Sequence, residues 1–311
     1  MYIHKPILLD PVLNLLGGQG EEIVLVDATL GEGGHAEAFL TADPRLMLIG
    51  IERDRQIIEH ARSRLEHFGG RVRLFRMDFL DFFSSLPQLV DQTPQRIFFD
   101  LGVSMFHFQA SGRGFSFRRA EPLDMRLDNE KGASAAQLIA SSSREELRDL
   151  IRCFGEERFA SAISTAIVKA GRQQPIEDAK RLADIIWKAV PPSYRYGRIH
   201  PATRTFQALR IAVNRELDLL EETLPLAFDS LQKGGRMGVI SFHSLEDRIV
   251  KRFFQERNKS CTCPPESPIC QCGGRREARI LTRKPLMAPA VEIRENPASR
   301  SARLRVVEKI V

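Results

Sequence analysis

The stretch Ile23-Val-Leu-Val-Asp27-Ala-Thr-Leu-Gly31-Glu-Gly33-Gly34-His35 decides the fold class. It has the pattern of a short buried strand that runs into a glycine-rich turn and opens a helix. Glycine suits such a turn because the backbone must bend sharply and approach a ligand without a Cβ in the way. The turn alone does not identify the ligand, because several nucleotide cofactors are held in this way and some glycine-rich turns are only turns.

Further apolar runs of strand length follow, several of them β-branched or aromatic. They lie at Leu46–Ile51, Val72–Phe75, Arg96–Phe99, Met237–Ser241 and Leu304–Val307. Segments of helical length separate the first four runs, and one of them, Arg55–Phe68, carries its apolar residues on one face. This alternation predicts an α/β fold with a parallel, doubly wound sheet of Rossmann type.

The strand pattern stops between about residues 105 and 202, where only helix signals occur. These signals are two capping boxes and an amphipathic helix that ends at two prolines, at Ser134–Gln137, Ser143–Glu146 and Ile176–Val190. A helix near Thr205–Leu224 leads back to the strands. We therefore predict a split cofactor-binding domain, residues 1–104 and 203–311, and an inserted all-helical domain, residues 105–202, that recognises the substrate.

Length and composition indicate a globular protein without a membrane span. The 311 residues suffice for one large α/β domain and a smaller unit. The longest apolar stretches, such as Ile97–Val103, are shorter than the ~20 residues of a membrane helix. Residues 1–6 lack the apolar core of a signal peptide, and the five cysteines do not resemble a disulfide framework. We expect a cytoplasmic protein; the sequence does not indicate the number of subunits.

The net charge of +6 is unevenly distributed along the chain. Residues 251–311 hold 14 Lys or Arg against 6 Asp or Glu, a net of +8, so residues 1–250 carry −2. A basic C-terminal quarter suits a polyanionic partner such as a nucleic acid. A solvated charged surface is the alternative interpretation.

The predicted strands end in residues that suit a ligand. Glu52, about 20 residues after the glycines, is placed to accept both hydroxyls of a ribose, as in sites for NAD and S-adenosylmethionine; a solvated strand-end charge is the alternative. Asp78 and Phe79 close the third strand with a polar and an aromatic residue that suit an adenine. Asp100 closes the fourth strand at the carboxyl edge of the sheet. This series resembles class I methyltransferases more than dehydrogenases, and His35, directly after the double glycine, is a further candidate contact.

Longer motifs narrow the resemblance to one family. They are His4–Leu9, Asp27–His35, Arg113–Phe117 with Pro122–Arg126, His200–Arg210, Val239–Arg248 and Ser299–Arg305. Together they resemble the bacterial 16S rRNA cytosine-N4 methyltransferases over the whole chain. The resemblance implies an S-adenosylmethionine-dependent enzyme that methylates the exocyclic amine of a cytidine in the decoding region of 16S rRNA. Its partner would be 16S rRNA or the small ribosomal subunit.

The resemblance also implies site residues. The predicted cofactor contacts are Gly31, Gly33, Gly34, His35, Glu52, Phe79 and Asp100. After Ser104 the family continues with serine, any residue, glutamine, leucine and aspartate, whereas this chain has Met105-Phe-His107-Phe-Gln109. His107 therefore stands at the position of the glutamine, and we keep it as a predicted contact because histidine also donates a hydrogen bond. Gln109 replaces the acid.

The chemistry of the implied reaction sets what the protein must supply. Cytosine N4 is a poor nucleophile, because its lone pair is delocalised, but a sulfonium methyl donor is strongly electrophilic. The protein must position the reactants in line and accept the charge that develops on the nitrogen. We predict Asp100 as the catalytic residue, although the sequence leaves open whether it holds the amine or only the cofactor. His243 is a second candidate, with a histidine that caps a helix before Glu246 as its alternative.

RNA recognition of this kind uses stacking on aromatic rings and arginine contacts, after the target base has left its stack. The predicted substrate contacts are Arg113, Arg126, Tyr194, Arg198 and Arg204, in or near the helical insertion. For any one of these arginines, an ion pair at a surface or domain interface is the alternative.

Four cysteines, Cys261, Cys263, Cys270 and Cys272, lie within twelve residues. A zinc site of four thiolates would be chemically sensible. The single residue between the members of each pair is unusual for zinc, however, and the resemblance implies no metal. We assign no metal and keep an exposed loop of free thiols as the alternative.

Two other functions stay open. The first is a non-catalytic RNA-binding protein on a methyltransferase fold, which the intact glycine turn, Glu52 and Asp100 speak against. The second is a methyltransferase of the same fold that acts on DNA or protein, which the full set of motifs disfavours but composition does not.

Overall fold

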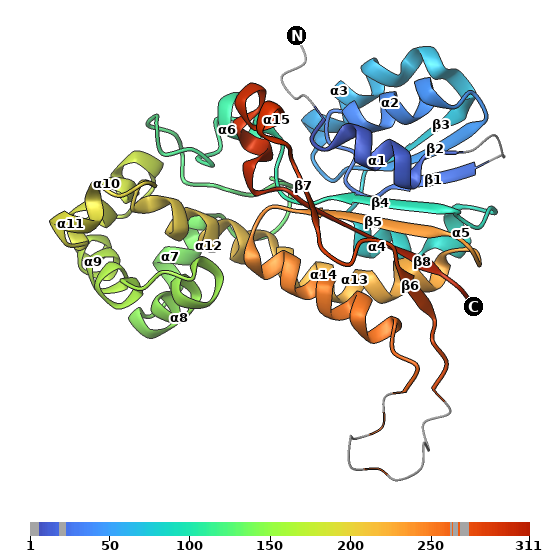
Figure 1. Cartoon of the computed structure of the whole chain (residues 1–311). Coiled ribbons are helices and arrows are strands. Elements are labelled where there is room, and N and C mark those ends of the chain that lie inside the picture. Colours follow the sequence, from blue (N-terminus) through green and yellow to red (C-terminus); the bar gives the residue numbers. More distant parts are fainter. Residues whose placement is uncertain (1–5, 19–22, 262, 264–266, 268–273) are drawn as a thin grey trace. The chain divides into compact units, whose positions relative to one another are not determined.

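The computed structural model describes residues 6–18, 23–261, 263, 267 and 274–311. The chain forms two compact units (Figure 1): the sheet unit of Met1–Val103 with Leu217–Val311, and the helical unit of Ser104–Glu216. The second boundary lies after Glu216 instead of after residue 202. Helix α12 (Ala202–Asn214) is the reason, because its buried side packs against α8 (Arg144–Gly155) of the helical unit.

The sheet unit alternates strands and helices along most of its length. Its strands are β1 (Ile23–Asp27), β2 (Leu46–Ile51), β3 (Val72–Phe75), β4 (Arg96–Asp100), β5 (Arg236–Ser241), β6 (Ala278–Ile280), β7 (Leu286–Met287) and β8 (Arg303–Lys309). Its helices are α1 (Leu9–Leu16), α2 (Gly34–Ala42), α3 (Arg55–Leu65), η1 (Glu66–Arg71), α4 (Phe79–Ser84), α5 (Leu86–Leu89), α13 (Glu216–Ser230), α14 (Ser244–Arg257), α15 (Ala290–Glu295) and η2 (Pro297–Ser301).

The strands form one sheet in the order β3-β2-β1-β4-β5-β8-β6, with β7 also paired to β8. Strands β1 to β5 are parallel to their neighbours, and β8 joins β5 antiparallel. The predicted α/β class with a mostly parallel sheet is confirmed, and every predicted strand is present. The short strands β6 and β7 were not predicted.

Helices cover both faces of the sheet (Figure 1). On one face, side chains such as Val26 and Phe99 pack against α4, α13 and α14; on the other, Leu25 and Phe98 pack against α1, α2 and α3. Successive residues of β1 and of β4 therefore face opposite cores, as the pleat of a strand requires. A strand buried on both faces needs apolar residues throughout, which is why these strands are continuous apolar runs in the sequence.

The helical unit consists of seven helices within Ser104–Glu216, all of them described. They are α6 (Met105–Gln109), α7 (Ala135–Ser141), α8, α9 (Ala160–Gln173), α10 (Ala179–Ala189), α11 (Pro192–Arg195) and α12. Both predicted capping boxes are confirmed at the N-termini of α7 and α8. Helix α10 begins later than predicted because the Asp178 side chain caps it by accepting from the Arg181 amide at 2.7 Å.

The predicted single helix Thr205–Leu224 is wrong. The structure has two helices there, α12 and α13, separated at Arg215, whose φ of 50° lies in the left-handed region. Within the described ranges, no helix combines the length and the apolarity that crossing a membrane requires.

Candidate functional site

The turn between β1 and α2 follows the ends of the central strands. The Leu30 amide donates to the Ile51 carbonyl at 2.9 Å, which fixes the turn against the end of β2. Gly31 (φ 53°) and Gly33 (φ 80°) both lie in the left-handed region that favours glycine. Gly33 is the N-cap of α2, and Gly34 is the first residue of that helix. The sequence's glycines therefore stand where the backbone needs them.

Four carboxyl groups gather at the carboxyl edge of the sheet. Asp27 and Asp100 are the last residues of β1 and β4, Glu52 follows β2, and Glu246 lies in the first turn of α14, after β5. Asp27 and Glu246 each act electrostatically on Asp100, and Glu52 acts on Asp27. Carboxylates this close repel one another when ionised, so the edge favours either protons or a cationic ligand.

Glu52 is tied to the backbone around it. One oxygen accepts from the Gly31 amide at 3.1 Å and the other from the Asp54 amide at 2.8 Å. Burial raises the pKa of Glu52 to about 7, and burial together with the charge of Glu52 does the same for Asp27, despite a hydrogen bond from Thr29. Glu52 therefore joins the glycine turn to the end of β2 and is no freely solvated charge.

Asp100 presents one oxygen that no described residue binds. Its Oδ1 is buried and has no hydrogen-bond partner in the described part of the chain. Its backbone amide donates to Thr29 Oγ1 at 2.5 Å, which fixes the end of β4 against the glycine turn. Burial first, and then the charges of Asp27 and Glu246, raise the pKa of Asp100 well above its usual value. A buried free acceptor of this kind is suited to a donor brought by a ligand.

His35 lies directly beside Asp100. Its Nδ1 is 3.4 Å from Asp100 Oδ2, and its Nε2 is 2.9 Å from the carbonyl oxygen of Ile7. Because a carbonyl only accepts, Nε2 carries a proton, and Nδ1 faces the carboxyl group. The ring centroids of His35 and Phe98 are 4.9 Å apart, edge to face. The imidazole is thus buried between the N-terminal segment and β4, with Asp100 as its polar neighbour.

The aromatic ring of Phe79 follows β3 as predicted, but the preceding acid, Asp78, serves as a helix cap. Asp78 caps α4 by accepting from the Asp81 amide at 2.9 Å. Phe79 is half-buried and meets Phe99 edge to face, with 5.8 Å between the ring centroids. Because Asp78 is engaged in capping α4, Phe79 is the member of the predicted pair that remains a candidate for contact with an adenine.

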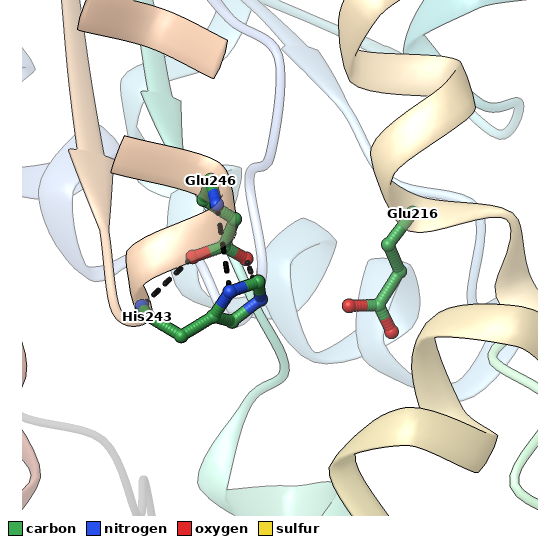
Figure 2. Close-up of side chains that lie close together, drawn as sticks. All are labelled: Glu216, His243 and Glu246. Carbon is green, nitrogen blue, oxygen red and sulfur yellow. Dashed lines mark hydrogen bonds and ion pairs between the residues drawn. The ribbon is translucent and has the colours of Figure 1, made fainter. Parts of the chain in front are cut away.

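His243 is the capping residue of α14 (Figure 2). Its Nδ1 accepts from the Glu246 amide at 3.4 Å, while Glu246 Oε2 accepts from the amides of Phe242 and His243 at 2.8 and 3.2 Å. The His243 Nε2 lies 3.1 Å from Glu246 Oε1. These contacts match the alternative interpretation of His243, in which this histidine caps the helix before Glu246. Glu216, also drawn in Figure 2, belongs to the helical unit, where it pairs with Arg210 at 2.8 Å.

An ion-pair network between α14 and β8 was not predicted. Asp247 accepts from Arg305 at 2.7 and 3.1 Å and from Arg303 at 3.1 Å. Burial alone would raise the pKa of Asp247, but the hydrogen bonds and charges of the two arginines lower it. The acid in the motif Val239–Arg248 and the arginines in Ser299–Arg305 thus meet in space. One ion-pair network thus joins residues of two motifs that lie far apart in the sequence.

Most of the predicted RNA contacts are engaged within the helical unit. Arg113 is buried and donates to the carbonyls of Arg126 and Leu127 at 3.3 and 3.0 Å. Arg126 itself forms a bidentate pair with Asp124 at 2.7 and 2.8 Å. These contacts disfavour a role for Arg113 and Arg126 in binding RNA.

Tyr194 and Arg204 are likewise held in place. The Tyr194 hydroxyl donates to Glu157 at 2.7 Å, and the Arg158 guanidinium covers the Tyr194 ring at 4.7 Å. Arg204 donates to the carbonyl of Glu156 at 2.9 Å. Of the five predicted substrate contacts, only Arg198 is exposed.

His107 and the described cysteines leave their predictions open. His107 is buried in α6 of the helical unit, and its ring centroid lies 4.9 Å from that of Phe115. Cys261 is exposed and Cys263 is partly exposed. Cys270 and Cys272 lie outside the described residues, so the question of a four-thiol site is not addressed by the structure.

The sheet edge as a whole fits a cationic, amine-bearing cofactor. The carboxyl groups are partly desolvated and mutually repelling, so a positively charged ligand relieves their repulsion. Asp100 Oδ1, which no described residue binds, adds an acceptor for an amine hydrogen of the cofactor or of a substrate. S-Adenosylmethionine carries both features in its sulfonium and its amino groups.

Comparison with known proteins gives a consistent result over the whole chain. The model of the MraW methylase family matches residues 1–310. The chain is 52% identical to the ribosomal RNA small subunit methyltransferase H of Treponema denticola over 309 residues, which cover 99% of this chain and 98% of that protein. It is 48% identical to the protein of the same name from Geobacter sp. strain M21, again with 99% and 98% of the two chains covered.

Proposed function

Because the chain belongs to the MraW methylase family, we propose that it methylates N4 of a cytidine in the decoding region of 16S rRNA, with S-adenosylmethionine as the methyl donor. The relatives described above carry the name of small-subunit ribosomal RNA methyltransferases. The single structural observation behind the proposed chemistry is the buried, unpartnered Oδ1 of Asp100 at the carboxyl edge of the sheet.

The sheet edge would hold the cofactor through groups already in place. Glu52 would accept from the ribose hydroxyls with the lone pairs that Gly31 and Asp54 leave free, and Phe79 would contact the adenine. The turn from Gly31 to His35 would lie along the cofactor's polar chain. When bound, S-adenosylmethionine supplies a methyl group that is electrophilic because it is attached to a sulfonium.

Asp100 would act on the amine of the target base. Its Oδ1 would accept a hydrogen bond from the exocyclic N4, which raises electron density on the nitrogen and orients its lone pair. As N4 gains a methyl group, it must release a proton, and Oδ1 would take that proton. No covalent bond between the protein and the base is required.

His35 would position Asp100 and not the substrate. The Ile7 carbonyl holds the proton on His35 Nε2, so Nδ1 presents a defined lone pair or a second proton to Asp100 Oδ2. That contact fixes the carboxyl plane and directs Oδ1 away from His35. We infer that the His35 side chain acts through Asp100.

The helical unit would recognise the RNA around the target. A base must leave its stack before its N4 can reach a buried acceptor, so the substrate strand must be unpaired locally. Arg198 and exposed basic residues of 251–311 outside the Asp247 network would contact the phosphates. The partner would be 16S rRNA, either free or within the small ribosomal subunit.

The test is methyl transfer from radiolabelled S-adenosylmethionine to naked 16S rRNA, to isolated small subunits and to single-stranded DNA, followed by nucleoside analysis. We expect N4-methylcytidine from one of the two ribosomal substrates and none from DNA. A protein that binds RNA but transfers no methyl group would support the non-catalytic alternative. Methylation of DNA alone would contradict the proposed substrate.

A further inference from the structure

Tyr196 is the most exposed large apolar side chain that the structure describes. It follows α11 in the helical unit, and 83% of its surface is exposed. Ile199, three residues later, is 48% exposed. Tyr194, the residue of the same segment that was predicted to contact RNA, is instead held by Glu157 and Arg158. An aromatic ring that is left in water beside a folded helix is a candidate for contact with a partner.

Tyr196 packs against a series of three further rings. Its ring meets that of Trp187 edge to face, with 5.8 Å between centroids. Trp187 stacks on His200 at 5.3 Å, and His200 stacks on Phe117 at 4.6 Å, with interplanar angles of 25° and 26°. Burial lowers the pKa of His200, although the charge of Asp184 acts in the opposite direction. The segment that carries Tyr196 is therefore anchored while its ring stays accessible.

The segment that carries this ring is rich in basic residues, although Asp184, which precedes it, acts on His200. From Ile185 to Arg215 it contains six Lys or Arg and no Asp or Glu. Arg198 is exposed two residues after Tyr196, and Lys188 is exposed one residue after Trp187. Arg195 has a structural task, because its guanidinium donates to the carbonyls of Val190 and Lys188 at 3.1 and 3.2 Å. An exposed aromatic ring flanked by exposed cations matches the chemistry of a single-stranded nucleic acid, which offers flat bases beside phosphates.

We propose that Tyr196 is a stacking platform for an unpaired base of the RNA substrate, with Arg198 beside it on a phosphate. The proposal rests on the proposed function and adds to it a recognition residue outside the sheet unit. Stacking on tyrosine accepts any base, so the platform would grip a single strand without reading its sequence. A protein partner would use the same apolar surface but would not require an unpaired base.

The chain contains a built-in reporter for this contact. Its only tryptophan is Trp187, whose ring touches that of Tyr196. A base that stacks on Tyr196 should therefore change the tryptophan fluorescence of the full-length protein. We would titrate the protein with a 12-residue unpaired oligoribonucleotide and with a fully paired RNA of equal length, and measure affinity independently by anisotropy of the labelled RNA.

We expect the unpaired RNA to quench Trp187 and the paired RNA to do so much less. Tyr196→Ala should abolish the quenching and weaken binding of the unpaired RNA about fivefold to a hundredfold, the range for losing one stacked base. Tyr196→Phe keeps the ring and should retain both signals. Arg198→Ala should weaken binding and reduce its dependence on salt by about one phosphate contact.

The results separate this inference from the proposed function. If Tyr196→Ala bound unpaired RNA as tightly as the wild type, the platform would be wrong even if methylation proceeded normally. The platform would also be wrong if paired RNA quenched the Trp187 fluorescence equally. It would likewise be wrong if Tyr196→Ala kept its affinity for unpaired RNA but no longer bound the proteins of ribosomal particles. A wild-type chain that bound unpaired RNA through Tyr196 but methylated no ribosomal substrate would instead overturn the proposed function.

Discussion

His35 stands behind Asp100, with its Nδ1 3.4 Å from Asp100 Oδ2 and its Nε2 held by the Ile7 carbonyl at 2.9 Å. The histidine of the glycine-rich turn is therefore joined to the acid at the end of β4. A group in this position can change the protonation and the orientation of Asp100 without touching either substrate. The first prediction tests that role.

His35→Ala should lower the rate of methyl transfer about tenfold to a hundredfold, because Asp100 loses the polar neighbour that lies 3.4 Å from its Oδ2. His35→Asn keeps a polar atom near Asp100 and should retain more of the rate. The measurement is the pH dependence of kcat and of kcat/KM for both variants. A role in folding alone would lower the amount of folded protein but leave the midpoint of the pH profile unchanged, and that result would contradict a positioning role.

Asp100→Asn should abolish methyl transfer and leave RNA binding close to that of the wild type. Asparagine is nearly isosteric but removes the negative charge and replaces one acceptor with a donor. If Asp100 stabilises the reacting amine, the barrier should rise by roughly 2.7–4 kcal/mol. Single-turnover methylation at saturating cofactor is the decisive measurement. Recovery to the wild-type rate would leave Asp100 with cofactor binding only.

Glu52→Ala should weaken binding of S-adenosylmethionine by about tenfold to a hundredfold, the cost of a lost charge-assisted hydrogen bond or two. The variant should also unfold at a lower temperature, because Glu52 accepts from the amides of Gly31 and Asp54. Glu52→Gln retains an acceptor and serves as the matched control for stability. Calorimetry that gave wild-type affinity for a folded Glu52→Ala protein would remove Glu52 from the cofactor site.

Cofactor binding should strengthen as the pH rises from about 6 to about 8. Burial raises the pKa of Asp27 and of Glu52 to about 7, so a cationic ligand must displace protons at lower pH. Calorimetry in buffers of different ionisation enthalpy should detect proton release on binding. An affinity that is independent of pH, with no proton released, would show that these groups are already ionised.

The same groups set the sign of the pH dependence of stability in the absence of cofactor. The folded chain keeps protons on Asp27 and Glu52 at pH values where the unfolded chain has released them. Their contribution to the free energy of unfolding is therefore fully present below about pH 4 and is lost as the pH rises to about 7. Urea unfolding at a series of pH values, with Glu52→Gln as the comparison, measures this contribution.

RNA binding should fall steeply with salt, whereas cofactor binding should change far less. For about four phosphate contacts with a single strand, a rise from 50 to 200 mM salt lowers the affinity roughly 50-fold. Filter binding or anisotropy with a fragment of 16S rRNA measures the slope. A flat response would exclude Arg198 and the basic residues of 251–311 as the docking surface.

The sequence predicted the sheet well because burial on both faces imposes a strong pattern. A strand such as β4 must be apolar at its three buried positions, 97–99, and the acid that ends it is then conspicuous. The positions of Glu52 and Asp100 at the ends of strands were predictable for this reason. The short strand β7 has only two residues, both exposed, and carries no such pattern. The break at Arg215 depends on one backbone angle that a non-glycine residue rarely adopts.

The intramolecular partners of the predicted substrate-contact residues could not be predicted from the sequence, because tertiary structure determines which groups a side chain meets. By residue type alone, Arg113 and Arg126 cannot be distinguished from arginines that bind RNA. In the structure, nearby carbonyls and Asp124 accept hydrogen bonds from them. Tyr194 and Tyr196 differ by two positions in one short segment, and only the turn after α11 determines which ring is exposed. Residue type indicated the segment, and the structure shows which of its two tyrosine rings is exposed.

The position of β8 in the sheet bears on how the chain avoids aggregation. This strand lies between β5 and β6, although it follows both in the sequence. Before residues 303–309 pair with β5, only the side of β5 next to β4 is hydrogen-bonded in the sheet. The other side exposes unpaired backbone donors and acceptors. An open edge on an apolar strand is a template for strands of other molecules. A chain interrupted before β8 would therefore be prone to self-association, even though its cofactor turn and helical unit were complete.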